Sequence, residues 1–482
     1  MPMPRMRPVA LSVALLAFAA QANASSEQLE AGLRAMFAND AGELTIDNVS
    51  DSLFGGSSTA EGLVYVEPSV GTLRIDSYVV NGDFDSPDDV VIEGITFSAE
   101  GSETDALSAD KLTLNRPDRA VVDPVEVLKG EMDFSAESVL LNALTVAINE
   151  QSAGSDADFI ELLEDFTGKV ALKRLEFRQV SQERVDGVTL EGMSSEFDEF
   201  QQLGAGSMSL DKLMMNGLNV AGMQTISEGD LDELAAPLIT EMTLNGFEID
   251  AEGLAASLES MVSDQDWSNG ETGTTVSNLV IDLGRVIEWV PADERTEVRM
   301  VSNILTGGSN ILTLNAEGSG SLEELSDGRA DYQVKSDVRL DDALSLKSMV
   351  GLVLLTPEGM SAADQVMQIE QGNLELLDFE SGKAHLGLVN QGLFNRLPAV
   401  AATVEGISEA EFIQQTRTQA KGMGNVLGPQ VSELMVGLVD MMEGKASQVD
   451  VSVTLPSFKS LETSIDDPLG LPDKLSMKVE VE

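Results

Sequence analysis

The sequence predicts an α+β fold that is mainly antiparallel β-sheet, built from repeated strand units and followed by a late helical segment. Short apolar or alternating runs recur from residue 44 to residue 146 and return after residue 276. Tight turn residues separate these runs, whereas parallel strands would need longer crossovers. Apolar residues then recur at helical spacing between residues 386 and 444.

Residues 1–24 are predicted to be a secretory signal peptide. Basic Arg5 and Arg7 precede an apolar run from Val9 to Ala20, and Ala22-Asn23-Ala24 supplies a cleavage site. The run is shorter than the roughly 20 residues of a spanning helix, so we expect cleavage, with a retained anchor as the alternative. We expect no integral membrane segment after the leader. The protein is therefore expected in the periplasm, with secretion or the cell surface as alternatives.

The chain is strongly acidic, with 29 Lys and Arg against 82 Asp and Glu and a net charge of −53. Such a surface repels phosphates, which argues against nucleic acid and anionic lipid headgroups as partners. The acidic residues are spread along the chain, a pattern that favours a solvated acidic surface over binding of a cation or a basic partner. The absence of Cys excludes disulfides, thiolate nucleophiles and Cys-based metal sites.

Residues 25–385 are predicted to be a β-rich region of repeated strands with short helices. Strands begin at Leu44, and one turn is expected at Pro87-Asp88-Asp89. Helices are expected over Glu27–Ala38, Asp156–Phe166, Asp230–Ala236 and Leu254–Val262. Later strands are expected over Val276–Leu283, Val298–Leu305, Ile311–Ala316 and Tyr332–Leu340.

One phrase recurs in this region. An acidic residue precedes a short apolar run that closes on Asn, and Gly follows the last two copies, where it permits a turn with positive φ. The copies are Leu107–Asn115, Phe134–Asn142, Met208–Asn216 and Leu238–Asn245. Their irregular spacing predicts a meander with duplicated strand units instead of a strict solenoid.

Residues 386–446 are predicted to be a helical segment that forms an insertion or lid. Ser408 with Glu411 three residues later is the sequence of a capping box, and Pro429 stands in the first turn of the clearest helix. Residues 447–482 return to period two, so we expect C-terminal strands that pair with the earlier sheet.

Few residues suit a familiar catalytic site. His385 is the single histidine, so a Ser-His-Asp triad would have to use it, yet no Gly-x-Ser-x-Gly elbow presents a serine. One His without Cys cannot supply an ordinary zinc site. We interpret His385 as a packed or surface side chain. Trp267 and Trp289 are the only tryptophans, which weakens the case for a carbohydrate enzyme.

The best local candidate for calcium is Asp264–Glu271, which begins like an EF-hand loop. Asn269 stands where the turn glycine belongs and Thr275 where the bidentate Glu belongs, so a polar turn is the favoured interpretation. A phosphate loop is absent from the sequence. The sequence therefore assigns no catalytic, cofactor-binding or metal-binding residue, and no cofactor is expected.

The 21 Met residues suggest a soft apolar surface that suits a ligand of variable shape, such as an acyl chain. The alternative is that they fill the core. Those singled out are Met214, Met215, Met223, Met435, Met441 and Met442.

The recurring strand phrases after a leader, with Gly392-Leu393-Phe394 ahead of the helices, resemble the YdgA-like and AsmA-like groups of proteobacterial periplasmic proteins. The resemblance is one of pattern from Leu44 to Leu314, and the chain differs from those groups in its acidity and its expected lack of a retained anchor. It implies a long curved sheet with an apolar inner face and a role with lipids or in envelope maintenance. It carries over no site residues.

Three functions follow as hypotheses. A continuous apolar groove open to solvent favours a non-enzymatic envelope protein that binds a lipid or an envelope partner. A closed core filled by side chains favours a structural or cell-surface interaction module. A hydrolase that uses carboxylates comes third, and it requires several Asp or Glu to converge in a cleft near Trp267 or Trp289.

Overall fold

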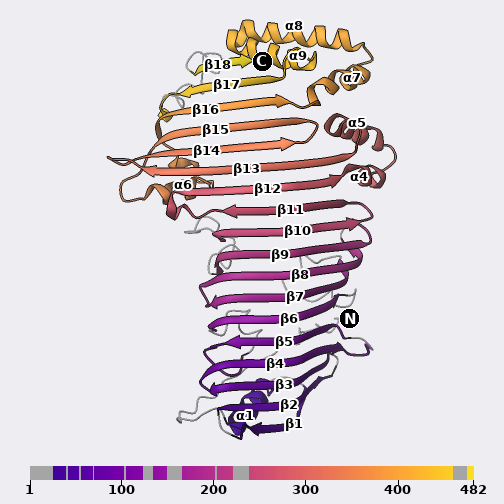
Figure 1. The fold of residues 1–482 in the computed structure, drawn as a ribbon, viewed down its shortest axis with the longest axis vertical. Coiled ribbons are helices and arrows are strands. Elements are labelled where there is room, and N and C mark those ends of the chain that lie inside the picture. The colour runs from indigo at the N-terminus through magenta and orange to yellow at the C-terminus, as the bar shows by residue number, and fades with distance from the viewer. Residues whose placement is uncertain are drawn as a thin grey trace, which may run out of the picture. The chain divides into compact units, whose positions relative to one another are not determined.

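The computed structural model describes residues 25–38, 42–53, 56–68, 70–102, 105–122, 134–148, 166–200, 203–220, 238–370, 372–459 and 475–482. These residues are mainly β, with antiparallel pairing throughout (Figure 1), which confirms the predicted class. The predicted leader lies outside them. The chain divides into two compact units between Glu252 and Gly253, inside the region that was predicted to be one. No helix of the described part is long and apolar enough to cross a membrane.

The described part of the first unit is a meander of ten strands in which each strand pairs with the next one along the chain (Figure 1). The strands are β1 (Glu43–Asp51), β2 (Ser57–Glu67), β3 (Gly71–Asp83), β4 (Ser86–Ala99), β5 (Leu107–Asn115), β6 (Ala136–Ile148), β7 (Phe166–Val180), β8 (Arg184–Phe200), β9 (Gly206–Asn219) and β10 (Glu241–Ala251). The first copy of the recurring phrase is β5, and the others fall in or overlap β6, β9 and β10.

Midway along these strands, one residue in every second strand adopts a left-handed backbone conformation. The left-handed residues are Gly62, Gly94, Ala143, Gly192 and Gly246, with φ between 53° and 64°. The residues that face them from the strands between are Asp47, Asp76, Asp110, Lys173 and Asp211. Regular pairing is interrupted at each of these ten positions and resumes beyond them with no residue added. We call these ten residues the inversion row.

The inversion row shifts the phase of the pleat. In β2 the buried positions are Ser58 and Ala60 before Gly62, but Leu63 and Tyr65 after it. A strand with period two would send one of these pairs to the opposite side. Because every strand of the unit shifts at the same place, both halves of each strand direct their apolar residues to one side of the sheet.

Helix α1 (Ser26–Met36) covers this apolar side at β1 and β2. Leu29, Leu33 and Met36 are buried in a cluster that reaches Ala136 of β6, and Phe37 stacks on Tyr65 with ring centroids 4.5 Å apart. A capping box starts the helix, in which the Ser25 side chain accepts a hydrogen bond from the backbone of Gln28. The helix predicted near residues 27–38 is confirmed.

Among its described residues, the second unit is a meander of eight strands, again paired in chain order. The strands are β11 (Ala255–Asp264), β12 (Glu271–Asp282), β13 (Ile311–Glu324), β14 (Arg329–Leu340), β15 (Leu344–Leu355), β16 (Phe379–Asn390), β17 (Gln448–Leu455) and β18 (Ser476–Val481). Shorter elements join them: η3 (Trp267–Asn269), α4 (Leu283–Trp289), α5 (Arg295–Thr306), α6 (Ala362–Glu370) and η4 (Leu374–Leu376).

Three helices lie between β16 and β17: α7 (Leu393–Glu405), α8 (Glu409–Leu427) and α9 (Pro429–Met442). Because β16 and β17 pair directly, these helices form an insertion between neighbouring strands. The Ser408–Glu411 capping box and Pro429 at the start of α9 occur as predicted. The predicted segment began at residue 386, whereas residues 386–390 still belong to β16. Met441 of α9 packs with Val449 and Val479 in one buried cluster.

Two element predictions in the second unit are wrong. Residues 298–305 lie in helix α5 instead of a strand, because the short apolar run also fits a helical face and Gly307 ends it in the left-handed region. Of the helix expected over residues 254–262, residues 255–262 lie in strand β11 instead. Here Glu259 faces left-handed Asn278 of β12, and pairing is again interrupted, so Leu258 and Met261 share a side at a spacing of three that imitates a helix.

The turn expected at residues 87–89 is also wrong. These residues belong to β4, and the chain reverses at Phe84 and Asp85, where Asp83 pairs with Ser86. The helix expected over residues 156–166 lies outside the described residues except for Phe166, which begins β7. The helix expected over residues 230–236 lies outside them entirely.

Candidate apolar binding site

Three cross-strand rows of apolar side chains occupy the apolar side of β6–β10. The first, the leucine row, contains Leu141, Leu175, Leu190, Leu213 and Leu244. The second, beside it, contains Val139, Phe177, Val188, Met215 and Met242. The third, across the inversion row from the leucine row, contains Leu144, Leu172, Met193, Leu210 and Phe247. Each row crosses four strand spacings, or about 19 Å.

These rows are incompletely covered. Only Val188 and Leu210 are buried, at 5% and 6% exposure, and the other members keep partial exposure. The equivalent rows in β2–β4 are buried in the cluster of α1, and the β6 members Val139, Leu141 and Leu144 pack against that cluster. A contiguous, partly exposed apolar surface of this kind is typical of a binding site.

An aromatic cluster lies at one end of the β6–β7 ladder, where Ile148 pairs with Gly168. Phe166, Phe197 and Phe200 pack together there with ring centroids 5.6–6.0 Å apart. A hollow of about 790 Å³ opens beside Phe197. This end offers both apolar contact area and space.

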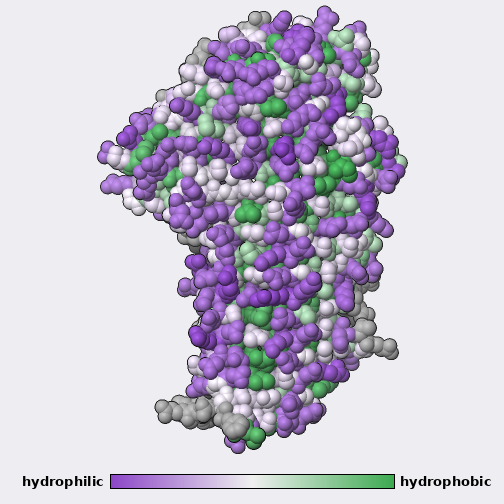
Figure 2. All heavy atoms as spheres, in the orientation of Figure 1, coloured by the Kyte–Doolittle hydropathy of each residue, from purple (hydrophilic) through white to green (hydrophobic). Residues whose placement is uncertain are grey.

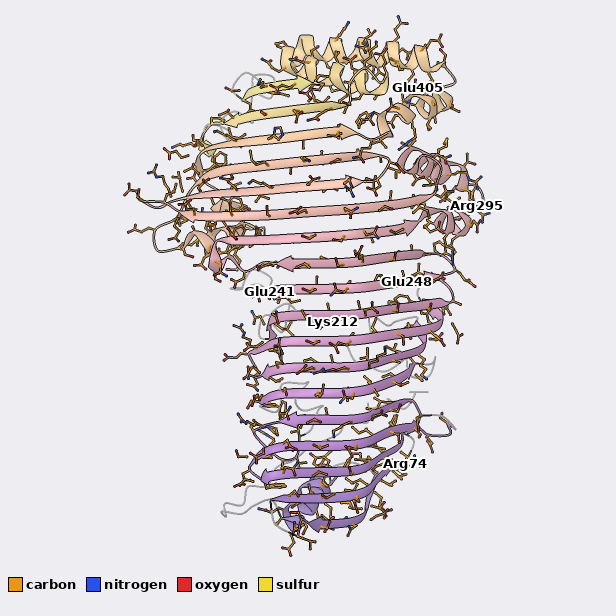
Figure 3. The ribbon with its side chains drawn as sticks, in the orientation of Figure 1. Arg74, Lys212, Glu241, Glu248, Arg295 and Glu405 are labelled. Atoms are coloured by element: carbon orange, nitrogen blue, oxygen red, sulfur yellow. The ribbon has the colours of Figure 1, made fainter. Side chains whose placement is uncertain are left out.

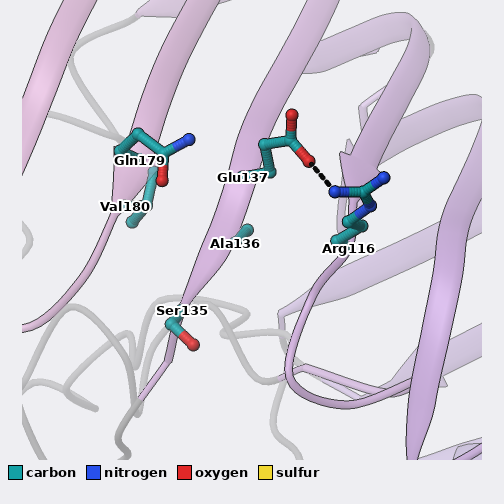
Figure 4. Close-up of a pocket in the computed structure, with 6 residues that line it drawn as sticks. All are labelled: Arg116, Ser135, Ala136, Glu137, Gln179 and Val180. Atoms are coloured by element: carbon teal, nitrogen blue, oxygen red, sulfur yellow. Dashed lines mark ion pairs between the residues drawn. The ribbon is translucent and has the colours of Figure 1, made fainter.

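A smaller polar hollow of about 440 Å³ lies at the other end of the same ladder, near Ala136 and Val180 (Figure 4). Arg116 and Glu137 form an ion pair of 3.0 Å in it, with side chains 77% and 50% exposed. An ion pair this exposed contributes little stability. The hollow offers hydrogen-bonding groups and little apolar surface.

The opposite side of the first unit carries polar ladders. Lys111 pairs with Glu93 at 2.9 Å and Lys212 with Glu191 at 3.3 Å. Lys212 lies along β9 beside β10 (Figure 3). Hydrophilic side chains cover most of the visible face of each unit, interrupted by hydrophobic patches (Figure 2).

Two closing Asn residues of the recurring phrase, Asn115 and Asn216, join a second ladder on that side. Asn115 donates its side-chain amide to Ser138 at 2.6 Å, and Asn216 donates to Glu241 at 2.7 Å. These bonds connect neighbouring strands on the side opposite the apolar rows. These Asn residues therefore help to hold neighbouring strands together, and they lie outside the candidate site.

His385 lies on β16 opposite Ser452 of β17. Its Nδ1 is 3.2 Å from Ser452 Oγ, and its Nε2 is 3.4 Å from Asp450 Oδ1. These are the residue types of a nucleophilic triad, and sequence reasoning did not connect them. Because β17 is paired on both sides, backbone N–H groups around Ser452 are used by the sheet and do not form an oxyanion hole. We interpret the set as polar surface residues.

The loop considered for calcium has the geometry of a polar turn. Asp264 accepts a hydrogen bond from the backbone of Asp266, and Asp266 accepts one from the backbone of Ser268. Gly270 follows with φ of 71° and ends the 3-10 turn. Within the described ranges, no group of three or more His, Asp or Glu is placed to hold a metal ion.

The two tryptophans have different surroundings. Trp267 is buried and donates its indole N–H to Glu370 at 3.1 Å, whereas Trp289 is 46% exposed. Tyr332 contacts the same carboxylate, and burial together with Glu370 raises the pKa of Tyr332 to about 12. The indole N–H of Trp267 and the hydroxyl of Tyr332 thus share the carboxylate of Glu370.

The methionines are divided among several environments. Met215 belongs to the apolar rows, whereas Met214 points to the opposite side of β9. Met441 is fully buried, Met435 and Met442 in α9 keep partial exposure, and Met223 lies outside the described residues. Some methionines therefore fill the core, as Met441 does, and others belong to a partly exposed apolar surface, as Met215 does.

Sequence reasoning missed the inversion row and the leucine row. A signal for them was present in the even-numbered strands, where an acidic residue or Asn precedes Gly or Ala between two apolar residues. The instances are Glu61-Gly62, Glu93-Gly94, Asn142-Ala143, Glu191-Gly192 and Asn245-Gly246. Of these residues, only Asn142 and Asn245 had been noticed as the ends of phrases, and Gly246 as a glycine that permits positive φ.

We found no match to a protein-family model, to a curated protein or to a solved structure.

Proposed function

We propose that the chain is an exported, non-enzymatic envelope protein that binds a lipid acyl chain on the apolar side of β6–β10. The observation that carries the proposal is the set of apolar rows that remain partly exposed. Covering apolar surface stabilises a complex by about 25 cal/mol per Å², so these rows would gain from a bound chain. The periplasm is the proposed location, with secretion or the cell surface as alternatives.

Charge narrows the class of lipid. With a net charge of −53, the protein repels anionic headgroups at low ionic strength. A zwitterionic or uncharged headgroup avoids this repulsion. We therefore propose a lipid without net negative charge as the ligand.

Native mass spectrometry tests the proposal. The purified full chain should retain lipid from the cell, or take up phosphatidylcholine after delipidation. Leu190→Asn, in the centre of the leucine row, should lose most of the bound lipid. Thr189→Asn changes the adjacent residue, which points to the other side of β8, and should bind lipid like the wild type.

Circular dichroism of both variants shows whether β-structure is preserved, so that loss of binding is separated from unfolding. A wild-type chain that neither retains nor takes up any lipid would contradict the proposal. Equal loss in both variants would place the site elsewhere.

We also infer that the strands are copies of one hairpin design, in line with the resemblance to YdgA-like and AsmA-like proteins. Two registers support it. Lys111 pairs with Asn142 between β5 and β6, and Lys212 pairs with Asn245 between β9 and β10. In both hairpins the left-handed residue comes directly after that Asn.

The closed core under α1 favours a scaffold role for β1–β5. Its rows are buried against Leu29, Leu33 and Met36 and leave little apolar surface for a ligand. The structural module thus remains the second candidate function, restricted to this part of the unit.

A further inference from the structure

Strand β7 is basic in a chain that is otherwise strongly acidic. The whole chain has 29 Lys and Arg against 82 Asp and Glu, whereas β6 and β7 together have four basic residues and two acidic ones. All four basic residues belong to β7: Lys169, Lys173, Arg174 and Arg178. They lie on the polar side of the sheet, opposite the apolar rows. A site on this side is therefore distinct from the proposed lipid site.

Most basic side chains in the described part of the first unit form ion pairs. Arg34, Lys111, Arg116, Arg119, Arg174, Arg184 and Lys212 each lie within 3.3 Å of a carboxylate oxygen. Four form no ion pair with the described residues: Arg74 on β3 and, together on β7, the exposed Lys169, Lys173 and Arg178. We call these three residues of β7 the basic strip. Ion pairing within the sheet does not account for it.

Lys173 departs from the pattern of the inversion row. Asp47, Asp76 and Asp211 each lie over a left-handed glycine of the next strand, where a Cβ would overlap the carboxylate. Lys173 lies over Gly192 in the same way, through the aliphatic carbons of its side chain. Because aspartate suits this position in the other strands, the sheet itself does not require a basic residue there.

Arg178 is oriented without a carboxylate. Its guanidinium lies over Gly187 of β8, where a Cβ would overlap Nη2 and Nε. Nη2 donates to Asn216 Oδ1 at 3.2 Å, and Asn216 in turn donates to Glu241 at 2.7 Å. A guanidinium has several N–H donors and can bind a carboxylate through two of them. Arg178 is thus held in position and keeps donors for a ligand.

The carboxylates nearest to the basic strip are mostly neutralised. Glu176 of β7 pairs with Arg174 at 2.8 Å, and Glu191 of β8 pairs with Lys212 at 3.3 Å. Glu196, in register with Lys169, is the exception among the described neighbours.

Strand β6, on the other flank of the basic strip, offers hydrogen-bonding groups without charge. Ser138 and Asn142 lie in register with Arg178 and Arg174, and Thr145 lies further along β6. Aromatic side chains do not occur on the polar side of β6 and β7.

We propose that the basic strip binds an extended acidic peptide segment of a partner protein, which lies along β7 on the polar side of the sheet. Three cations along one strand fit carboxylates that follow one another along an extended chain. The absence of aromatic side chains there argues against single-stranded nucleic acid, whose bases stack on such rings. The acidic excess of the chain repels polyanions, but at about 0.15 M salt the Debye length is about 8 Å, so the nearest charges dominate.

Fluorescence anisotropy tests the proposal with the full chain and a fluorescein-labelled peptide of alternating Glu and Thr. We expect saturable binding in about 0.15 M salt that weakens as salt is added. The same peptide with Gln in place of Glu should not bind.

Two triple variants, which remove the same number of charges, locate the site. Replacing Lys169, Lys173 and Arg178 by Gln should raise the dissociation constant about tenfold or more. The matched control replaces three ion-paired bases by Gln, namely Lys111, Arg184 and Lys212. The control should bind the acidic peptide with nearly the affinity of the wild type.

Lys173→Asp keeps the test valid if the triple variant does not fold. It places at this position the residue that Asp47, Asp76 and Asp211 supply in other strands, so the sheet should form, as circular dichroism can check. Its binding of the acidic peptide should fall, whereas its uptake of lipid should stay unchanged.

The outcomes that contradict the proposal differ from those that bear on lipid. Absence of peptide binding in the wild type, or equal loss in both triple variants, would overturn the basic strip as a binding site. Tighter binding of polygalacturonate than of the peptide would overturn a peptide as its partner. Each of these results leaves the proposed lipid site untouched.

Discussion

At the residue scale, the first unit depends on pairs in which a left-handed glycine faces an aspartate. A Cβ on Gly62, Gly94 or Gly246 would overlap the carboxylate of the facing aspartate. Glycine is therefore required there for two reasons, the positive φ and the close approach of a side chain. Ala143 is the exception among the left-handed residues of the row, with φ of 53°.

Tyr78 is a second residue on which the core depends. It is fully buried, and burial raises the pKa of its hydroxyl, which stays protonated and donates to the carbonyl oxygen of Ala120 at 2.8 Å. Tyr78→Phe leaves that carbonyl without its donor. We expect a loss of about 1–3 kcal/mol in the free energy of unfolding, measured by urea unfolding followed with far-ultraviolet circular dichroism.

Tyr332→Phe is the matched control. The Tyr332 hydroxyl lies 3.4 Å from Glu370 in an exposed contact, where water can replace it. Its removal should cost less than that of the Tyr78 hydroxyl. Equal losses would show that the buried bond to Ala120 adds nothing.

At the element scale, α1 is fastened to β1 through a carboxylate. Asp51 accepts hydrogen bonds from the backbone and hydroxyl of Ser26 at 2.6 and 2.9 Å, and from the Ser58 hydroxyl at 2.8 Å. The Ser58 bond, followed by those of Ser26, lowers the pKa of Asp51 below its ordinary 3.8. Because the folded-state pKa is lowered, the stabilisation is present above about pH 4 and is lost as the pH falls through the folded value.

We therefore expect α1 to loosen from β1 in acid before the sheet unfolds. Hydrogen exchange of the α1 amides, compared at each pH with a helix-free strand of the same unit, measures this. In Asp51→Asn the additional loss of protection below about pH 4 should disappear. If the wild type and Asp51→Asn lost α1 protection equally in acid, the loss would be due to carboxylates other than Asp51.

The helices and strands differ in how far the sequence predicts them. The capping box at Ser408 and Pro429 at the start of α9 depend on local chemistry, so both were found without the fold. Strand β11 was mistaken for a helix because its phase shift at Glu259 depends on left-handed Asn278 of the next strand. That information is not local, and no periodicity of β11 alone contains it.

The candidate site was less predictable than the fold. Each leucine of the leucine row is an ordinary apolar residue in its own strand, and only the registers of four strand pairs align the five. Their partial exposure depends on where α1 packs, since the equivalent rows near β2 are buried. The sequence could predict that one side of the sheet is apolar. It could not predict which strands keep that side partly exposed.

At the scale of the whole molecule, the main electrostatic effect is repulsion among the acidic side chains. The chain has 53 more acidic than basic residues, and several basic side chains are already paired on the surface of the strands, as Lys111 and Lys212 are. Surface pairs of this kind contribute about 0–1 kcal/mol each. The unpaired acidic excess therefore decides how the folded state responds to salt.

We expect salt to stabilise the protein. Between about 0.1 M and about 1 M salt the Debye length falls from about 10 Å to about 3 Å, so repulsion between carboxylates on neighbouring strands weakens more than the few attractive pairs do. The melting temperature, followed by circular dichroism, should rise by a few degrees over this range. Sucrose at matched osmolality is the control for solvent exclusion, and it should raise the melting temperature less than sodium chloride does. A melting temperature that falls with salt would mean that the polar ladders, with Lys111 and Lys212 at their centre, stabilise the folded state more than the acidic excess destabilises it.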